Sequence, residues 1–330
     1  MGRRSTRQES SARRILLVAL AILTASTLTS GASTPEPYAA PVAAVAESLS
    51  PPALERRYQA VREDIGAALT TARRLGDDQR VRVLSAFLGS GRRFLTFDGR
   101  GDGKAVEVHG DLARAGRIAV VVPGADGELD NYDSWKFAGG GAKALYGEMR
   151  RTAPGERVAV VAWLGYDSPS VLSPVILTDG RAGDAARGLR RFLAELREVN
   201  PAARYSLLAH SYGSVVVGKA AAKDELAVDE IAVFGSPGTS VDSAADLRTR
   251  ARVWAGRSAG DWTEYVPNVE FAGVGFGTDP TDARFGALRF DAGSGSHSEY
   301  LKPGSPSLRT LALIALGHDP EAGHARHQDA

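Results

Sequence analysis

Five short apolar runs, separated by segments with helical patterns, constrain the fold of this chain more than any other feature of its 330 residues. Apolar runs of this length are typical of strands that are buried on both faces. Strands that alternate with helices form βαβ units, which build a parallel sheet. The sequence therefore predicts an α/β fold, a mostly parallel twisted sheet with helices on both faces. The expected strands are Ile118–Val122, Arg157–Trp163, Tyr205–Ala209, Glu230–Phe234 and Arg252–Ala255.

Helical patterns lie between and after these strands. We expect the helices at Trp135–Arg150, Arg181–Glu198, after Gly213, at Ser243–Arg250 and at Ser307–Leu316. Two further strands, Arg93–Phe97 and Ala105–His109, are joined by a turn rich in Gly and Asp, which tolerate the backbone angles of a hairpin. We expect these antiparallel strands at one edge of the sheet.

An N-terminal helical extension precedes the sheet. Ser50 and Pro51 have the residue types of a helix cap and first turn, and apolar residues recur every three or four positions from Leu54 to Leu75. A second helix is expected at Asp78–Leu88. We therefore predict a helical segment at 45–90 packed on a core domain at 91–317, followed by a polar tail at 318–330.

The first 44 residues have the order of an export signal. Five arginines between positions 3 and 14 precede an apolar run that starts at Ile15 and ends near Ala25, and small residues follow. The run is shorter than the roughly 20 residues of a membrane span. We predict a secreted or cell-envelope protein with no stable membrane span in its mature form. An uncleaved anchor and a wrongly assigned start codon are the alternatives.

Composition excludes several classes of function. The formal net charge is +1 and there are no cysteines, so the chain lacks the basic surface typical of nucleic-acid binding and any thiolate nucleophile or Cys-ligated zinc. The acidic stretch Asp126–Asn131 lacks the full pattern of a calcium loop. The glycine-rich segments lack the strand–helix context of a dinucleotide site. We expect no nucleic acid, no metal and no cofactor.

The sequence Ala209-His-Ser211-Tyr-Gly213 lies where an apolar strand ends and a helix begins. This is the small-x-Ser-x-Gly form of the nucleophile elbow, in which small residues are needed because strand and helix nearly touch. Ser211 is therefore the candidate nucleophile. A buried structural serine in a helix cap is the alternative.

A serine nucleophile needs a general base that is oriented by an acid. After an elbow serine, the acid comes first in the chain and the histidine second. His297, in a Gly/Ser-rich loop, is the candidate base, and Asp261 is the candidate acid, with Asp242 and Asp279 as rivals. His210 is expected to point away from the site.

An oxyanion hole completes such a site. One donor is expected to be the backbone N–H of Tyr212, which follows the nucleophile. The loop after Ile118–Val122 should supply the other, at Ala125, because Gly124 lets the backbone turn inward. Trp163 and Tyr166 are candidates for lining the acyl pocket together with Gly124, although core packing is equally compatible with Trp163.

Six motifs together resemble an actinobacterial α/β-hydrolase family that is classified mainly as a domain of unknown function. They are Val121–Gly124, Ala162–Pro169, Ala209–Ser214, Phe234–Gly238, Arg252–Ala255 and Thr278–Asp282. The resemblance covers about residues 80–317. It implies the α/β-hydrolase fold and a Ser/Asp/His site at Ser211, Asp261 and His297, and it implies no particular substrate.

These features predict an esterase-like or lipase-like serine hydrolase that acts on a small-molecule, lipid or polymer ester through an acyl-enzyme. Two other functions fit the same residues. An extracellular acyltransferase would use the same triad and pass the acyl group to a sugar or lipid hydroxyl. A binding protein would retain the fold without catalysis, since fold does not determine function.

Overall fold

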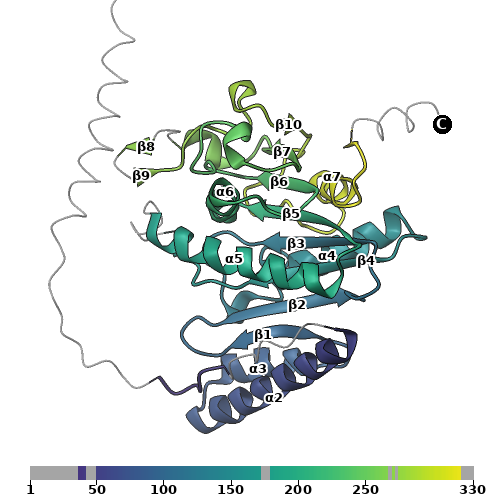
Figure 1. Ribbon diagram of the computed structural model, residues 1–330. Coiled ribbons are helices and arrows are strands. Elements are labelled where there is room, and N and C mark those ends of the chain that lie inside the picture. Colours follow the sequence, from purple (N-terminus) through teal and green to yellow (C-terminus); the bar gives the residue numbers. More distant parts are fainter. Residues whose placement is uncertain (1–35, 42–49, 172–178, 267–269, 272–273, 321–330) are drawn as a thin grey trace, which may run out of the picture. The chain divides into compact units, whose positions relative to one another are not determined.

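The computed structural model describes residues 36–41, 50–171, 179–266, 270–271 and 274–320 (Figure 1). Within them, eight strands form one sheet in the order β1-β2-β4-β3-β5-β6-β7-β10. β2 pairs antiparallel with β1 and with β4, and all the other pairs are parallel. The strands are β1 Phe94–Asp98, β2 Lys104–Gly110, β3 Arg117–Val122, β4 Val158–Leu164, β5 Arg204–His210, β6 Glu230–Phe234, β7 Arg252–Gly256 and β10 Leu288–Arg289. The two-residue strands β8 Glu270–Phe271 and β9 Val274–Gly275 pair separately.

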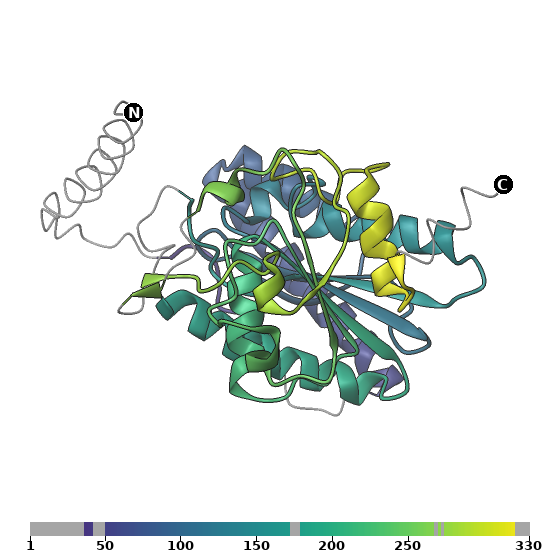
Figure 2. The ribbon, with the colours of Figure 1, turned by 90° about the horizontal axis from the view of Figure 1, so that it is seen from above.

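Helices cover both faces of the sheet (Figure 2). α5 and α6 pack in one apolar cluster with Ile118, Val120 and Val122, whereas α4 and α7 pack in the other with Ala119 and Val121. Alternate residues of β3 therefore face opposite layers, as the pleat of a strand requires. The helices are α2 Pro51–Leu75, α3 Asp78–Phe87, α4 Ala138–Thr152, α5 Asp179–Val199, α6 Tyr212–Lys223 and α7 Pro306–Ala315.

This architecture confirms the predicted fold class, including the antiparallel edge and the N-terminal helices. α2 and α3 pack together beside β1, at the antiparallel edge (Figure 1). Residues 37–330 group into one compact unit. The finer boundaries at 45, 91 and 318 remain predictions. The export signal lies mostly outside the described residues. In the described part of the chain, every helix is too short or too polar to cross a lipid bilayer.

Several elements differ from the expectation. α4 begins at Ala138 rather than Trp135, with Phe137 in an extended conformation before it. Its first turn packs closely on the preceding segment, since a Cβ at Gly139 would lie 2.2 Å from the Tyr132 ring. The helix expected at Ser243–Arg250 is a single 3₁₀ turn, Ala244–Leu247, which ends at a left-handed Arg248. The two-residue strands β8, β9 and β10 were not predicted, because two residues carry no periodic pattern.

Candidate active site

Ser211 lies at a strained turn between β5 and α6. Its φ of 51° lies in a region that few residues other than glycine adopt, and its side chain is buried. The turn depends on close packing: a Cβ on Gly213 would lie 2.6 Å from the carbonyl oxygen of Pro123, and one on Gly124 would lie 2.7 Å from Cβ of Ser211. The small residues of the motif therefore have the steric role that the sequence predicted.

His297 connects Ser211 to Asp261. Its Nε2 lies 3.0 Å from Oγ of Ser211, and its Nδ1 lies 2.9 Å and 3.0 Å from the two carboxylate oxygens of Asp261. A carboxylate accepts hydrogen bonds, so Nδ1 carries the proton of the neutral ring and Nε2 is left to accept from the serine hydroxyl. The structure thus brings together the three residues in the arrangement that a general base requires.

Asp261 is buried and receives several hydrogen bonds. The backbone N–H and the hydroxyl of Thr263 each donate to Oδ1 at 2.8 Å, and the hydroxyl of Tyr300 donates to Oδ2 at 2.6 Å. Burial alone raises the pKa of Asp261, but the hydrogen bonds from His297, Tyr300 and Thr263 outweigh it and hold the pKa well below its ordinary value. Asp261 therefore stays ionised beside His297.

The rival acids have other partners. The carboxylate of Asp279 pairs with Arg257 at 2.7 Å and accepts two hydrogen bonds from Thr281. Asp242 accepts a 3.3 Å hydrogen bond from the hydroxyl of Thr278. Both aspartates therefore serve local loop structure, and Asp261 is the one that faces His297.

The backbone segments predicted for the oxyanion hole lie beside Ser211. Tyr212 is the first residue of α6, and Gly124 and Ala125 line the same cavity as Ser211. The hydroxyl of Tyr166 lies 2.8 Å from the carbonyl oxygen of Pro123 and 3.0 Å from that of Gly124. These contacts hold the backbone of the 123–124 segment in place. The roles of the Tyr212 and Ala125 amides remain predictions.

Trp163 and Tyr166 lie outside this cavity. Both are buried, 2% and 4% exposed, and their rings stack with centroids 5.8 Å apart in the layer that α5 covers. Their placement does not support the prediction that they line the acyl pocket. Tyr166 contacts the site indirectly, through the carbonyl groups of the 123–124 segment.

Comparison with known proteins identifies the family. The sequence profile described as alpha/beta hydrolase matches residues 98–271, which is more than half of the chain. The chain belongs to the α/β-hydrolase family. Hydrolysis is therefore the class of reaction that the fold supports.

Relatives of this α/β hydrolase include two mycobacterial proteins. Uncharacterized protein Rv2079 of Mycobacterium tuberculosis is 31% identical over 69% of this chain and 40% of its own length, so the chain spans well under half of that relative. Uncharacterized protein Rv0963c of the same species is 35% identical over 42% of this chain and 53% of its own length. Among solved structures, the α/β serine hydrolase XC6422 of Xanthomonas campestris is 18% identical over 69% of this chain and 95% of that chain, with a TM-score of 0.42.

The site of this α/β hydrolase opens into a cavity of about 390 Å³. Ser211 and His297 lie in its wall, and Val171 and Trp262, which are 44% and 48% exposed, contribute apolar surface. The volume lies within the range of small-molecule sites, roughly 300–1,000 Å³. Among the residues that the structure describes, no group of three acidic, His or Cys side chains could hold a metal ion.

Sequence reasoning placed His210 wrongly. Its side chain lines the cavity together with Ser211, and its ring centroid lies 4.8 Å from that of His297. Tyr300, three residues after His297, was also missed. Both contacts depend on the loop at 293–300 folding back over the end of β5, and no local pattern in the sequence encodes that path.

Proposed function

We propose that this protein is a serine hydrolase that cleaves carboxylic esters through an acyl-enzyme, with Ser211 as nucleophile, His297 as general base and Asp261 as the acid that orients it. One observation carries the proposal: an unbroken chain of hydrogen-bonding distances from Asp261 through His297 to Ser211. A strained serine, a base with the correct free nitrogen and a buried carboxylate are the parts that acyl transfer requires.

The first half-reaction forms the acyl-enzyme. Nε2 of His297 takes the proton of the Ser211 hydroxyl as Oγ attacks the ester carbonyl, and the negative charge of Asp261 stabilises the imidazolium. The backbone amides of Tyr212 and Ala125 donate to the oxyanion of the tetrahedral intermediate. Collapse of the intermediate breaks the bond to the alcohol, which takes its proton from His297. In deacylation, His297 takes a proton from water as the water oxygen attacks the acyl carbonyl, and Ser211 Oγ leaves and takes that proton back from His297.

The cavity supports a substrate that combines polar and apolar parts. Trp262 and Val171 offer apolar surface, and Asp126 and Lys136 place one charge of each sign in the wall. We propose a small-molecule or lipid ester, or the ester group of a polymer. The apolar acyl part would contact Trp262 and Val171.

The protein is also proposed to be exported, on the basis of residues 1–44 alone. A fusion of this segment to a reporter enzyme tests the idea in an actinobacterial host. We expect the reporter in the medium or the cell envelope. Retention of the reporter in the cytoplasm would contradict it.

Release of p-nitrophenolate from p-nitrophenyl acetate and butyrate tests the proposed chemistry. The wild-type protein should hydrolyse one or both esters, and Ser211→Ala should abolish the reaction. Ser206→Ala is a matched control, because Ser206 is a buried serine of β5, the strand that leads to Ser211, and its hydroxyl donates to the carbonyl oxygen of Ala315. Equal rates for the two variants would contradict the proposal.

A further inference from the structure

The loops that carry the acid and the base form a single unit, which we call the acid–base block (residues 258–261 and 293–300). The backbone N–H of Ala259 donates to the carbonyl oxygen of Gly293 at 3.0 Å, and the hydroxyl of Ser258 donates to that of Gly295 at 2.6 Å. The hydroxyl of Tyr300 bonds to Asp261 from within the same block. These contacts hold His297 and Asp261 together whatever the position of Ser211.

The nucleophile belongs to a different part of the structure, at the end of β5. Two hydrogen bonds join the end of β5 and the turn after it to the acid–base block. One is the contact between Ser211 Oγ and His297 Nε2, at 3.0 Å. The other runs from Nε2 of His210 to the backbone carbonyl oxygen of His297, at 2.8 Å. The second bond therefore links the residue next to the nucleophile with the residue that serves as the base.

The protonation of His210 suits this contact. A carbonyl oxygen can only accept, so Nε2 of His210 carries the proton and donates it. Burial, and then the nearby His297, lower the pKa of His210 to about 3. The ring stays neutral at the pH of catalysis, so it neither competes as a base nor repels the imidazolium that forms on His297.

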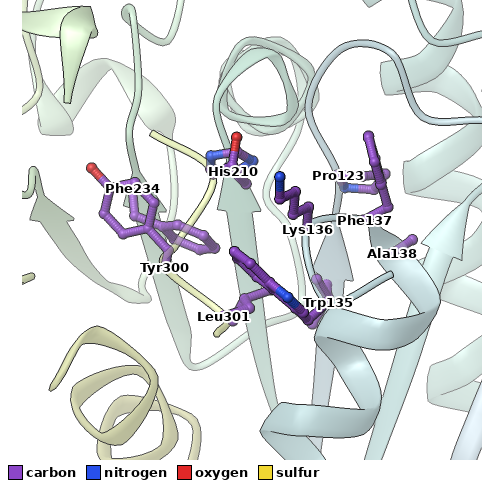
Figure 3. Close-up of a pocket in the computed structure, with 11 residues that line it drawn as sticks. Pro123, Trp135, Lys136, Phe137, Ala138, His210, Phe234, Tyr300 and Leu301 are labelled. Atoms are coloured by element: carbon purple, nitrogen blue, oxygen red, sulfur yellow. The ribbon is translucent and has the colours of Figure 1, made fainter. Parts of the chain in front are cut away.

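Aromatic packing fixes the orientation of His210. Its ring stacks on Phe234 at a centroid distance of 5.5 Å and lies 5.6 Å from the Tyr300 ring. Figure 3 shows His210 with Phe234 and Tyr300 on one side and Lys136 on the other. Because Tyr300 belongs to the acid–base block and Phe234 ends β6, this packing also joins the block to the sheet.

We propose that His210 is a positioning residue that sets the distance between His297 and Ser211 by holding the backbone carbonyl of His297. The inference rests on the proposed function, because the distance matters only if His297 activates Ser211. The packing of His210 does not require an imidazole, since a phenyl ring could fill the same space. What a phenyl ring lacks is the donor.

Two variants separate the donor from the ring. His210→Phe keeps a planar ring and removes the N–H group, whereas His210→Gln places an amide N–H near the position of Nε2. We expect the second-order rate of labelling by a fluorophosphonate probe to fall on the order of tenfold to a hundredfold in His210→Phe, as expected for a misplaced base. His210→Gln should stay within about threefold of the wild type. His109→Phe is the matched control. His109 lies in β2, away from the site, and its ring stacks on that of Tyr146 in α4.

Ring NMR signals of ¹⁵N-labelled histidine give a readout that does not depend on activity. In His210→Phe, the signal of the Nδ1 proton that faces Asp261 should persist, because the acid–base block holds that pair. The Nε2 signal of His297 should change, because its contact with Ser211 loosens.

Unchanged signals at both nitrogens, or loss of the Nδ1 proton in both His210 variants, would overturn the positioning role. Full-rate labelling of His210→Phe would also overturn it. Failure of the wild type to label would instead overturn the proposed function, and the NMR comparison would still decide the role of His210.

Discussion

The hydroxyl of Tyr300 donates a 2.6 Å hydrogen bond to Oδ2 of Asp261 and accepts one from the backbone N–H of Ser258 at 3.0 Å. The acid of the proposed triad is therefore held by a side chain from the loop that also carries the base. Asp261 and His297 are 36 residues apart in the sequence. The tyrosine makes their relative position a property of one connected unit rather than of two separate loops.

Tyr300→Phe should weaken both the fold and the site. Loss of a hydrogen bond to a charged group lowers the free energy of unfolding by about 1.5–3 kcal/mol. Ester hydrolysis should also slow, because Asp261 gains freedom to move. Tyr205→Phe is the control, since the hydroxyl of Tyr205 bonds to the carbonyl oxygen of Leu196, away from the site. Chemical denaturation and hydrolysis rates check the prediction. It is wrong if Tyr300→Phe retains the full rate or if both variants lose activity equally.

Asp261→Asn should lower the rate of hydrolysis about 10⁴-fold, because an amide no longer stabilises the imidazolium and can favour the wrong tautomer of His297. Asp242→Asn should leave the rate unchanged, because Asp242 contacts Thr278 on an exposed loop. The comparison uses kcat/KM for a p-nitrophenyl ester. The opposite pattern would assign the acid to Asp242.

Gly235→Ala should lower the rate of hydrolysis strongly, because the added methyl group would displace the acid and the base. Gly235 has a φ of 55°, and a Cβ there would lie 2.8 Å from Oδ2 of Asp261 and 3.2 Å from Nδ1 of His297. We expect hydrolysis to fall on the order of tenfold to a hundredfold. Gly286→Ala controls for backbone strain, because Gly286 has a φ of 83° and open space around it. The positive φ alone should cost each variant about 1–2 kcal/mol of stability. Equal activity of the two variants would remove Gly235 from this role.

Acidification should destabilise the protein partly through His210. The pKa of this histidine is about 3 in the folded protein, against an ordinary value of 6.5. As the pH falls below 6.5, the unfolded chain binds a proton that the folded protein excludes, so stability falls until the pH approaches 3. Between pH 7 and 5 the contribution reaches up to about 2 kcal/mol. His210→Gln should lose correspondingly less stability over this interval in denaturation curves. An identical pH dependence in both proteins would contradict the assignment.

The sequence predicted most of the fold because its signals are local. The apolar runs of β3 to β7 fall within one residue of the observed ends, since continuous burial on both faces requires unbroken apolar residues. The nucleophile, acid and base could be proposed because a steric motif marks Ser211 and chain order selects Asp261 and His297. The structure shows that these three side chains meet.

The remainder of the site depends on contacts between distant segments. The contact of His210 with the carbonyl of His297 spans 87 residues. It exists because the 293–300 loop crosses the end of β5, and nothing in the motif around Ser211 determines that path. Trp163 was a candidate pocket residue, yet its side chain lies on the face of the sheet that α5 covers. Which face a side chain takes becomes clear only when the layers are assembled.

Mass analysis after fluorophosphonate labelling tests directly whether Ser211 is the nucleophile. We expect the wild-type protein to gain one phosphonyl group, the modified peptide to contain Ser211, and Ser211→Ala to gain none. Ser206→Ala should label like the wild type. An unlabelled wild-type protein, or an adduct that persists in Ser211→Ala, would contradict the assignment of Ser211 as the nucleophile.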